Sequence, residues 1–214
     1  MIDDSEKSNK SNNLKQPPLL LASGSPRRHS LLKSLGFLFH VEVSGAEEKE
    51  TGLAPNDLAL ANAELKAKEV LERSVRANNA WVIGADTVVC LDGELLGKPT
   101  SREEVQTHLK KLSGKTHQVI TGMALLSRGK APLLEATTTS VRFRKLSAEE
   151  IAAYSKTAEP MDKAGSYAIQ GLGALFVESV EGSYTNVVGF PVETFLRLLQ
   201  RATGEHPFSW FELP

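Results

Sequence analysis

One carboxylate stands out among the residues that could do chemistry. Asp86 follows Gly84-Ala85 within the otherwise apolar, β-type run Trp81–Leu91. Burying a carboxylate there is costly unless a metal ion or a hydrogen-bond partner compensates it, and the neighbouring glycine would let another group approach closely. The alternative is an aspartate in a strand-end turn that backbone N–H groups hold. We favour a functional carboxylate, able to bind a metal ion or to act on a substrate.

A second candidate is the segment Ser23–Ser30, which reads Ser-Gly-Ser-Pro-Arg-Arg-His-Ser. The apolar residues 18–22 before it predict a buried strand, and Pro26 suits the first position of a helix that Ser25 would cap. The N-terminus of such a helix offers unpaired backbone N–H groups and the positive end of the helix dipole.

Arg27 and Arg28 add two positive charges at that N-terminus. Backbone donors together with paired guanidinium groups are suited to binding a polyphosphate. An ordinary capped helix with solvated arginines is an equally good interpretation of this segment taken alone, because most helix N-termini are purely structural.

Lysines and further acidic residues form a third group. Lys98 follows a predicted hairpin, whereas Lys66 and Lys68 are two apart on a predicted helix and therefore cannot share one face. The acidic pair 47–48 lies in a charged run, and Asp162 lies in a loop-like segment. Each of these residues, taken alone, is consistent with a solvated surface position.

Several motifs that would define other enzyme classes fail on inspection. The segment Ser113–Thr116 resembles the end of a P-loop, but Leu109 occupies the position of the required glycine. Gly171–Gly173 lacks the third glycine of a dinucleotide fingerprint, and the histidines show no metal-ligand spacing. No Gly-x-Ser-x-Gly elbow occurs. P-loop NTPases, zinc enzymes and serine hydrolases are therefore disfavoured.

Composition excludes other classes. The 214 residues carry a net charge of −1, so no overall field favours nucleic acid or an anionic membrane. The single cysteine, Cys90, cannot form an internal disulfide, and its apolar surroundings indicate a packed thiol. Without a signal-peptide pattern or a transmembrane-length apolar stretch, a cytoplasmic protein is expected.

Alternating strand and helix patterns predict an α/β protein with a mixed sheet. Capping boxes at Ser101 and Ser147 and a hairpin signal at Asp92-Gly93 mark element ends. The expected strands are residues 18–22, 37–43, 81–91 with a break at 84–86, 94–97, 116–126, 133–143 and 174–180. The expected helices are residues 26–35, 56–73, 101–112, 147–155 and 191–201. We expect a flexible polar tail at 1–17, a domain at 18–203 and a C-terminal extension at 204–214.

Seven motifs, taken in order, resemble the Maf family of nucleoside triphosphate pyrophosphatases, and the resemblance covers residues 18–200. They are Leu21-Ala-Ser-Gly-Ser-Pro-Arg-Arg28, Ile83-Gly-Ala-Asp-Thr87, Gly97-Lys-Pro99, Lys111-Leu-Ser-Gly-Lys-Thr-His117, Glu159-Pro-Met-Asp-Lys-Ala-Gly165, Ala168-Ile-Gln-Gly-Leu-Gly173 and Asn186-Val-Val-Gly-Phe-Pro191.

The resemblance implies an elongated α/β domain around a mixed, partly antiparallel sheet with a deep cleft, similar to inosine triphosphatases. It also implies hydrolysis of nucleoside triphosphates to the monophosphate and pyrophosphate with Mg²⁺ or Mn²⁺. Members are also described as septum-formation inhibitors, and homodimers are common among them. No nucleic-acid or membrane partner is expected.

Residue roles follow from the same resemblance. Asp86 matches the catalytic carboxylate, assigned as proton acceptor, and with Glu47 it would bind the metal. Arg27, Thr87 and Gln170 match positions linked to substrate choice. The other residues that match the substrate cleft are Ser23, Arg28, Lys66 and Lys98.

Thr87 and Gln170 resemble the branch of the family that acts on dTTP and UTP. The amide of Gln170 can pair with the N3–H donor and a carbonyl acceptor of thymine or uracil, although a flipped amide would also accept cytosine. Two alternatives stay open: a pyrophosphatase for modified nucleotides, and a nucleotide-sensing regulator of cell division.

Overall fold

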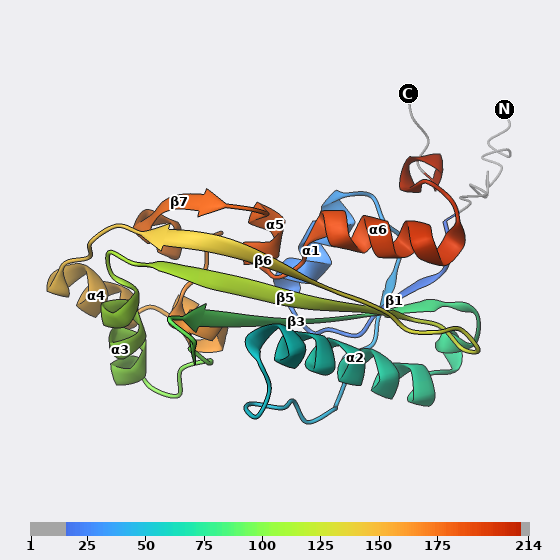
Figure 1. Cartoon of the computed structure of the whole chain (residues 1–214), viewed down its shortest axis with the longest axis horizontal. Helices are drawn as coiled ribbons and strands as arrows, with labels where there is room; N and C mark the ends of the chain where they lie inside the picture. Colours follow the sequence, from blue (N-terminus) through green and yellow to red (C-terminus); the bar gives the residue numbers. More distant parts are fainter. Residues whose placement is uncertain (1–15, 211–214) are drawn as a thin grey trace, which may run out of the picture.

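A mixed sheet runs along the elongated molecule (Figure 1). The computed structural model describes residues 16–210. Its seven-stranded sheet has the order β2-β1-β3-β5-β6-β7, with β4 also paired to β3. Strand β1 is parallel to both of its neighbours, and the other pairs are antiparallel. The strands are β1 (Leu19–Leu21), β2 (His40–Val41), β3 (Trp81–Leu91), β4 (Glu94–Leu95), β5 (Thr116–Leu126), β6 (Leu133–Phe143) and β7 (Val177–Glu181).

Helices cover both faces of the sheet. Helix α2 lies on one face, α1 and α6 lie on the other, and α3 and α4 gather at one end (Figure 1). The helices are α1 (Pro26–Ser34), α2 (Pro55–Arg73), α3 (Arg102–Leu112), α4 (Ala148–Ser155), α5 (Tyr184–Val188) and α6 (Val192–Thr203). Short 3-10 helices occupy Val75–Asn79, Glu159–Asp162, Ala164–Ser166, Leu172–Phe176 and Pro207–Trp210.

Each covering layer has its own apolar core. Leu32 of α1 and Phe195 of α6 pack with Ile83 and Met123 on one face of the sheet. On the other face, small residues of α2 such as Ala63 and Ala67 pack against the strands. A third cluster joins α3 and α4 to the far ends of β3, β5 and β6.

Two glycines let α2 lie directly on the sheet. A Cβ at Gly84 would stand 2.0 Å from the carbonyl oxygen of Ala63, and one at Gly122 would stand 2.3 Å from the backbone of Ala59. The expectation that a glycine near Asp86 permits a close approach is therefore confirmed. The predicted break at 84–86 is wrong, because β3 pairs continuously with β5 through these residues.

The three longest strands, β3, β5 and β6, have the predicted bounds. Asp92 and Gly93 both have positive φ, 52° and 86°, in the turn between β3 and β4. Strand β2 is much shorter than predicted, with only two residues. Residues 172–176 form a 3-10 helix, so β7 begins at Val177 and not at 174, and the short helix α5 was not predicted.

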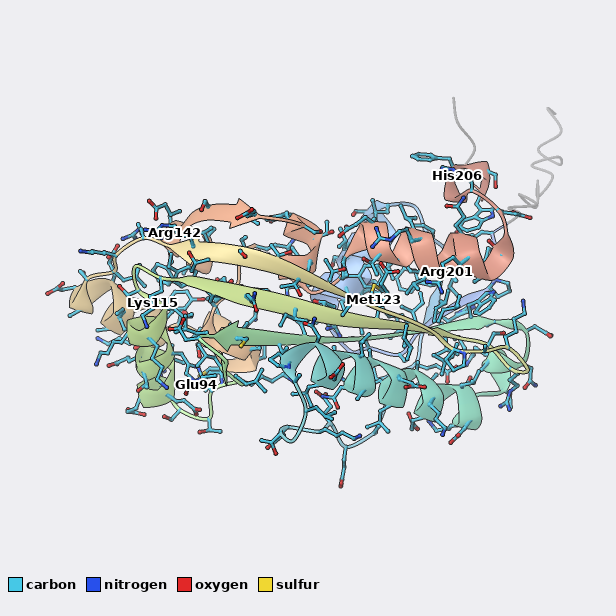
Figure 2. All side chains as sticks on the ribbon, in the orientation of Figure 1. Glu94, Lys115, Met123, Arg142, Arg201 and His206 are labelled. Carbon is cyan, nitrogen blue, oxygen red and sulfur yellow. The ribbon has the colours of Figure 1, made fainter. Side chains whose placement is uncertain are left out.

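The first and last described segments, near residues 16 and 210, lie at the end of the sheet opposite α3 (Figure 1). Figure 2 places Glu94 and Lys115 near α3, Arg201 and His206 at the opposite end, and Met123 between them. Within the predicted C-terminal extension, Trp210 is buried in the core beside α6, and its Nε1 donates to Glu205 at 2.7 Å. Residues 1–15 of the predicted tail and 211–214 lie outside the described residues. Between residues 16 and 210, no helix combines the length and the apolar character needed to span a membrane.

Candidate active site

A cleft of about 340 Å³ opens beside the middle of β3. Most of its lining side chains fall into two sets. The polar wall, as we name it, consists of Ser23, Arg27, Arg28, Glu48, Lys66, Asp86, Thr87 and Lys98. The apolar wall consists of Val89, Val119, Tyr167, Ile169, Val187 and Val188, with the exposed Gln170 beside them. The cleft therefore suits a ligand with one charged and one flat apolar part.

Asp86 projects from the middle of β3 and is 6% exposed. Lys66 Nζ donates to its Oδ1 at 2.7 Å, and Asn62 Nδ2 donates to its Oδ2 at 3.2 Å. Burial alone would raise the pKa of Asp86, but the charges of Lys66 and Arg28 and these hydrogen bonds outweigh it, so the pKa is lowered. Asp86 is thus a buried, ionised carboxylate at neutral pH.

Lys66 is shared between two carboxylates. Its Nζ lies 3.0 Å from Glu48 Oε1 as well as 2.7 Å from Asp86 Oδ1. Lys68, two residues on, instead forms an exposed i,i+4 pair with Glu72, as expected for lysines on different faces of one helix.

The structure brings Glu48, and not Glu47, to this site. Glu48 lines the cleft and contacts Lys66, whereas Glu47 is exposed and is not among the lining residues. The two residues adjoin in a segment without regular structure, where sequence pattern does not specify which side chain points inward.

Asp86 and Glu48 fit a divalent cation in part. Both carboxylates converge on one ammonium group, so a cation is well placed between them. Among residues 16–210, no group of three or more His, Cys, Asp or Glu side chains could hold a metal ion. A cation here would therefore take its remaining ligands from substrate and water, as Mg²⁺ commonly does.

Arg28 is built into the site and is not solvated. It is 9% exposed, and burial lowers its pKa. Its guanidinium donates to Gly189 O at 2.7 Å, Ala85 O at 2.9 Å, Ser23 Oγ at 3.0 Å and Thr87 Oγ1 at 3.1 Å. Because most of its donors are used within the protein, Arg28 holds α1 against β3 and supplies positive charge from the cleft wall.

Arg27 lies at the mouth of the cleft. Its Nη1 is 3.7 Å from Asp162 of the facing 3-10 segment. Lys163 also lines the cleft and pairs with Asp162. Lys98 is exposed, and among the described residues it forms no ion pair. Arg27 and Lys98 are therefore available to an anionic ligand.

The N-terminus of α1 is open to such a ligand. Ser25 is the N-cap residue, as predicted, but its side chain makes no capping hydrogen bond, and the first turn contains no acidic residue. Ser25 N donates to Ser23 Oγ at 3.3 Å and Pro26 has no N–H, so the N–H groups of Arg27 and Arg28, which lack an acceptor among the described residues, are the ones that favour an anion.

The apolar wall depends on the segment Glu159–Gly173. The carboxylate of Glu159 accepts hydrogen bonds from Leu172 N and Gly173 N, both at 2.9 Å, and from Tyr154 Oη at 2.8 Å. It thereby joins the two ends of the segment that carries Gln170. The amide of Gln170 makes no hydrogen bond to residues 16–210, so it is free to bind a ligand.

Thr87 contacts Arg28 on one side and Thr121 of β5 on the other. Its Oγ1 accepts from Arg28 Nη2 and lies 2.9 Å from Thr121 Oγ1.

Sequence reasoning missed Asn62, Glu48 and Lys163 as site residues. The available signal for Asn62 was its position one turn before Lys66, since residues four apart share a helix face.

The fold is that of an α/β protein with a mixed sheet, and its cleft is lined by charged residues on one side. A HAM1 protein from Coxiella burnetii has a similar fold, with a TM-score of 0.50 and 16% identity over 89% of this chain and all of that one. Residues 18–202 match the family described as Maf-like protein. This chain belongs to the Maf family.

Curated relatives of high similarity carry one name. A dTTP/UTP pyrophosphatase of Thermococcus gammatolerans is 49% identical over 84% of this chain and 94% of its own length. The dTTP/UTP pyrophosphatase of Thermus thermophilus is 47% identical over 86% of this chain and 94% of its own length. The protein of that name from Deinococcus radiodurans is 46% identical over 87% of this chain and 93% of its own length.

Proposed function

We propose that this chain hydrolyses nucleoside triphosphates, with dTTP and UTP favoured, to the monophosphate and pyrophosphate. The observation that carries this proposal is Asp86, a buried, ionised carboxylate that faces a cleft edged by a helix N-terminus and basic side chains. The names of the relatives from Thermococcus gammatolerans and Thermus thermophilus support the choice of nucleotides.

The polar wall would bind the triphosphate. Hydrogen-bond donors are available from the N–H groups at the start of α1 and from the side chains of Arg27 and Lys98. Arg28 contributes a fixed positive charge. Such a site acts mainly by positioning the phosphates and stabilising the charge that develops on the leaving pyrophosphate.

Asp86 would orient the attacking water and accept its proton. The water oxygen forms a bond to the α-phosphorus, the bond from that phosphorus to the bridging oxygen breaks, and pyrophosphate leaves. Since the pKa of Asp86 is lowered, the carboxylate is ionised but weakly basic at neutral pH. Asp86 and Glu48 would hold the divalent cation together with phosphate oxygens. When bound, the cation supplies acidification of the water.

The apolar wall would hold the base. Tyr167 and the valines offer flat or aliphatic surface, and the free amide of Gln170 offers one acceptor and one donor. These match the N3–H and a carbonyl of thymine or uracil.

The test is pyrophosphate release from dTTP, UTP, CTP, ATP, GTP, ITP and 7-methyl-GTP, with Mg²⁺, Mn²⁺ or EDTA. We expect metal-dependent hydrolysis of dTTP and UTP above the rest. Asp86→Asn should reduce kcat by roughly 10³-fold while nucleotide binding persists. Gln170→Glu should lower kcat/KM for dTTP more than for the other nucleotides.

Other outcomes would change the proposal in defined ways. Activity centred on ITP or 7-methyl-GTP would reject the proposed specificity and keep the chemistry. Nucleotide binding without hydrolysis by any member of the panel would reject the enzyme and favour a nucleotide sensor. Full turnover by Asp86→Asn would remove Asp86 from the mechanism.

A further inference from the structure

Asn62 is a buried amide that touches two parts of the site at once. It lies on α2, is 2% exposed, and directs Nδ2 toward Asp86 Oδ2 at 3.2 Å. The same Nδ2 donates to Lys49 O at 2.9 Å, and Oδ1 accepts from Lys49 N at 2.8 Å. One side chain thus pairs with both backbone groups of Lys49 and with the carboxylate on β3.

The orientation of this amide is determined by its partners. The Lys49 N–H requires an acceptor and the Lys49 carbonyl requires a donor, so a flipped amide would lose both hydrogen bonds. Nδ2 must therefore face the carbonyl, and its second hydrogen is available to Asp86.

The segment that contains Lys49 has few other anchors. Residues 44–54 connect β2 to α2 without regular secondary structure and lie beside α2 (Figure 1). In this part of the described chain, Gly45 N donates to Glu69 Oε2 at 3.3 Å, and Glu48 forms an ion pair with Lys66. The two hydrogen bonds between Asn62 and the backbone of Lys49 lie directly after Glu48 in the chain, so they fix the backbone beside Glu48.

Asp86 is fixed by the same residue. Lys66 binds Oδ1 and Asn62 binds Oδ2, so rotation of the carboxylate would break one of the two hydrogen bonds. Without Asn62, Oδ2 of Asp86 would lose its hydrogen-bond partner among the described residues. The backbone of Lys49 would lose two hydrogen bonds.

We propose that Asn62 is a positioning residue that sets Asp86 and Glu48 opposite each other across Lys66. It acts on Asp86 directly and on Glu48 through the backbone of Lys49. The inference rests on the proposed function only in assigning the two carboxylates to cation binding and hydrolysis. The geometric part is tested without substrate.

Two substitutions separate positioning from packing. Asn62→Leu keeps the branching and the number of heavy atoms of the side chain and removes all three hydrogen bonds. Asn62→Asp is nearly isosteric and keeps an acceptor for Lys49 N–H, but it places a second negative charge against Asp86. Asn56→Ala, at an exposed position in the first turn of α2, is the matched control.

In the first experiment, hydrogen–deuterium exchange by mass spectrometry follows peptides that cover residues 44–54, with circular dichroism as the check on folding. We expect Asn62→Leu to raise exchange there by roughly tenfold, because both hydrogen bonds to the backbone of Lys49 are lost. Exchange in α3 and β6 should be unchanged. Asn56→Ala should behave as the unmodified chain.

The second experiment measures kcat and KM for dTTP at pH 7. A lost positioning contact of this kind typically costs 10–100-fold, so kcat of Asn62→Leu should fall by about that factor while KM changes by less than about threefold. Asn62→Asp removes the donor to Asp86 and keeps the acceptor for Lys49 N–H, so its kcat should fall by a similar factor. A merely structural role would not separate kcat from KM in this way.

The proposal is overturned if Asn62→Leu folds normally and matches the unmodified chain in loop exchange and kcat. It is also overturned if folded Asn62→Asp keeps the kcat of the unmodified chain. If Asn62→Leu does not fold, Asn62→Asp decides the outcome. If the unmodified chain hydrolyses none of the nucleotides, the proposed function fails, while the exchange experiment still tests the geometry.

Discussion

Most of the polar wall of the cleft is carried by β3, α1 and α2, whereas Tyr167 and Ile169 of the apolar wall, and Gln170 beside them, come from one segment of turns, Glu159–Gly173. Asp86 sits within an 11-residue strand that pairs continuously with β5. Gln170 sits in a segment whose two ends are joined through the carboxylate of Glu159.

This difference separates two tasks within one cleft. Groups that rise from packed strands and helices are held to within the tolerance that catalysis needs. The segment Glu159–Gly173 is held by individual long-range hydrogen bonds, such as Gly165 N to Leu96 O at 2.8 Å and His108 Nδ1 with Ser166 Oγ at 2.7 Å, and not by strand pairing. We therefore expect chemistry to be sensitive to the packing of α2 on β3, and base preference to be sensitive to the 3-10 segment.

The largest effect is expected where α2 meets β3. In Gly84→Ala, the new Cβ would lie 2.0 Å from Ala63 O, so α2 must move away from the sheet. We expect a loss of roughly 3 kcal/mol in the free energy of unfolding and a drop in kcat beyond tenfold, since Lys66 and Asn62 move with the helix. Urea denaturation and steady-state kinetics measure both.

Gly45→Ala is the control, because a Cβ there meets nothing within 4 Å and its φ is ordinary. It should change stability by less than about 0.5 kcal/mol. If Gly84→Ala is as stable and as active as that control, the polar wall does not depend on the close contact of α2 with the sheet, and the contrast between the walls disappears.

Much of the scaffold could be predicted from the sequence because its signals are local. The strand-like character of residues 116–126 and 133–143 predicted β5 and β6 with correct bounds, and Ser147 forms the predicted capping box with Glu150. The 3-10 helix at Leu172–Phe176 could not be predicted in the same way, because Glu159, 13 residues earlier in the chain, accepts the hydrogen bond of Leu172 N.

The site was predictable in its residue types and less so in its geometry. Asp86 was identified because a carboxylate in an apolar strand is unexpected. The exchange of Glu47 for Glu48 follows from an irregular segment in which neighbouring side chains give no periodic signal. The burial of Arg28 depends on Gly189, which is 161 residues away, and no local pattern reports that contact.

The next largest effect concerns pH at the apolar wall. His117 is buried, its Nε2 lies 2.8 Å from Tyr167 Oη, and burial lowers its pKa to about 4. An unfolded histidine has a pKa near 6.5, so between these values the unfolded chain binds a proton that the folded chain does not. Stability therefore falls as pH decreases below about 6.5, and this group accounts for about 2 kcal/mol between pH 7 and pH 5.

His117→Gln removes the titration and keeps a polar group beside Tyr167. The difference in unfolding free energy between pH 7 and pH 5 should shrink by about 2 kcal/mol relative to the unmodified chain. His206→Gln, at an exposed position, should not change that difference. An unchanged pH dependence in His117→Gln would show that the apolar wall is no more acid-sensitive than the rest of the fold.

The smallest effect, and the sharpest comparison, concerns Glu159. Its two carboxylate oxygens accept from Leu172 N, Gly173 N and Tyr154 Oη, and these hydrogen bonds contribute to lowering its pKa against the opposing effect of burial. In Glu159→Gln, one acceptor becomes an NH₂ group that faces a backbone donor, so the segment that presents Gln170 should loosen. We expect the ratio of kcat/KM for dTTP over CTP to fall by roughly tenfold, equivalent to a hydrogen bond of about 1.4 kcal/mol.

Glu178→Gln is the matched control, because Glu178 forms an exposed ion pair with Arg142 on the outer strands of the sheet. It should leave the ratio unchanged. If Glu159→Gln instead lowers kcat equally for every nucleotide, the apolar wall shapes the reacting centre as well as the base site. The two tasks would then not be separable, because a change confined to the 3-10 segment would have displaced groups that β3 and α2 are expected to hold independently.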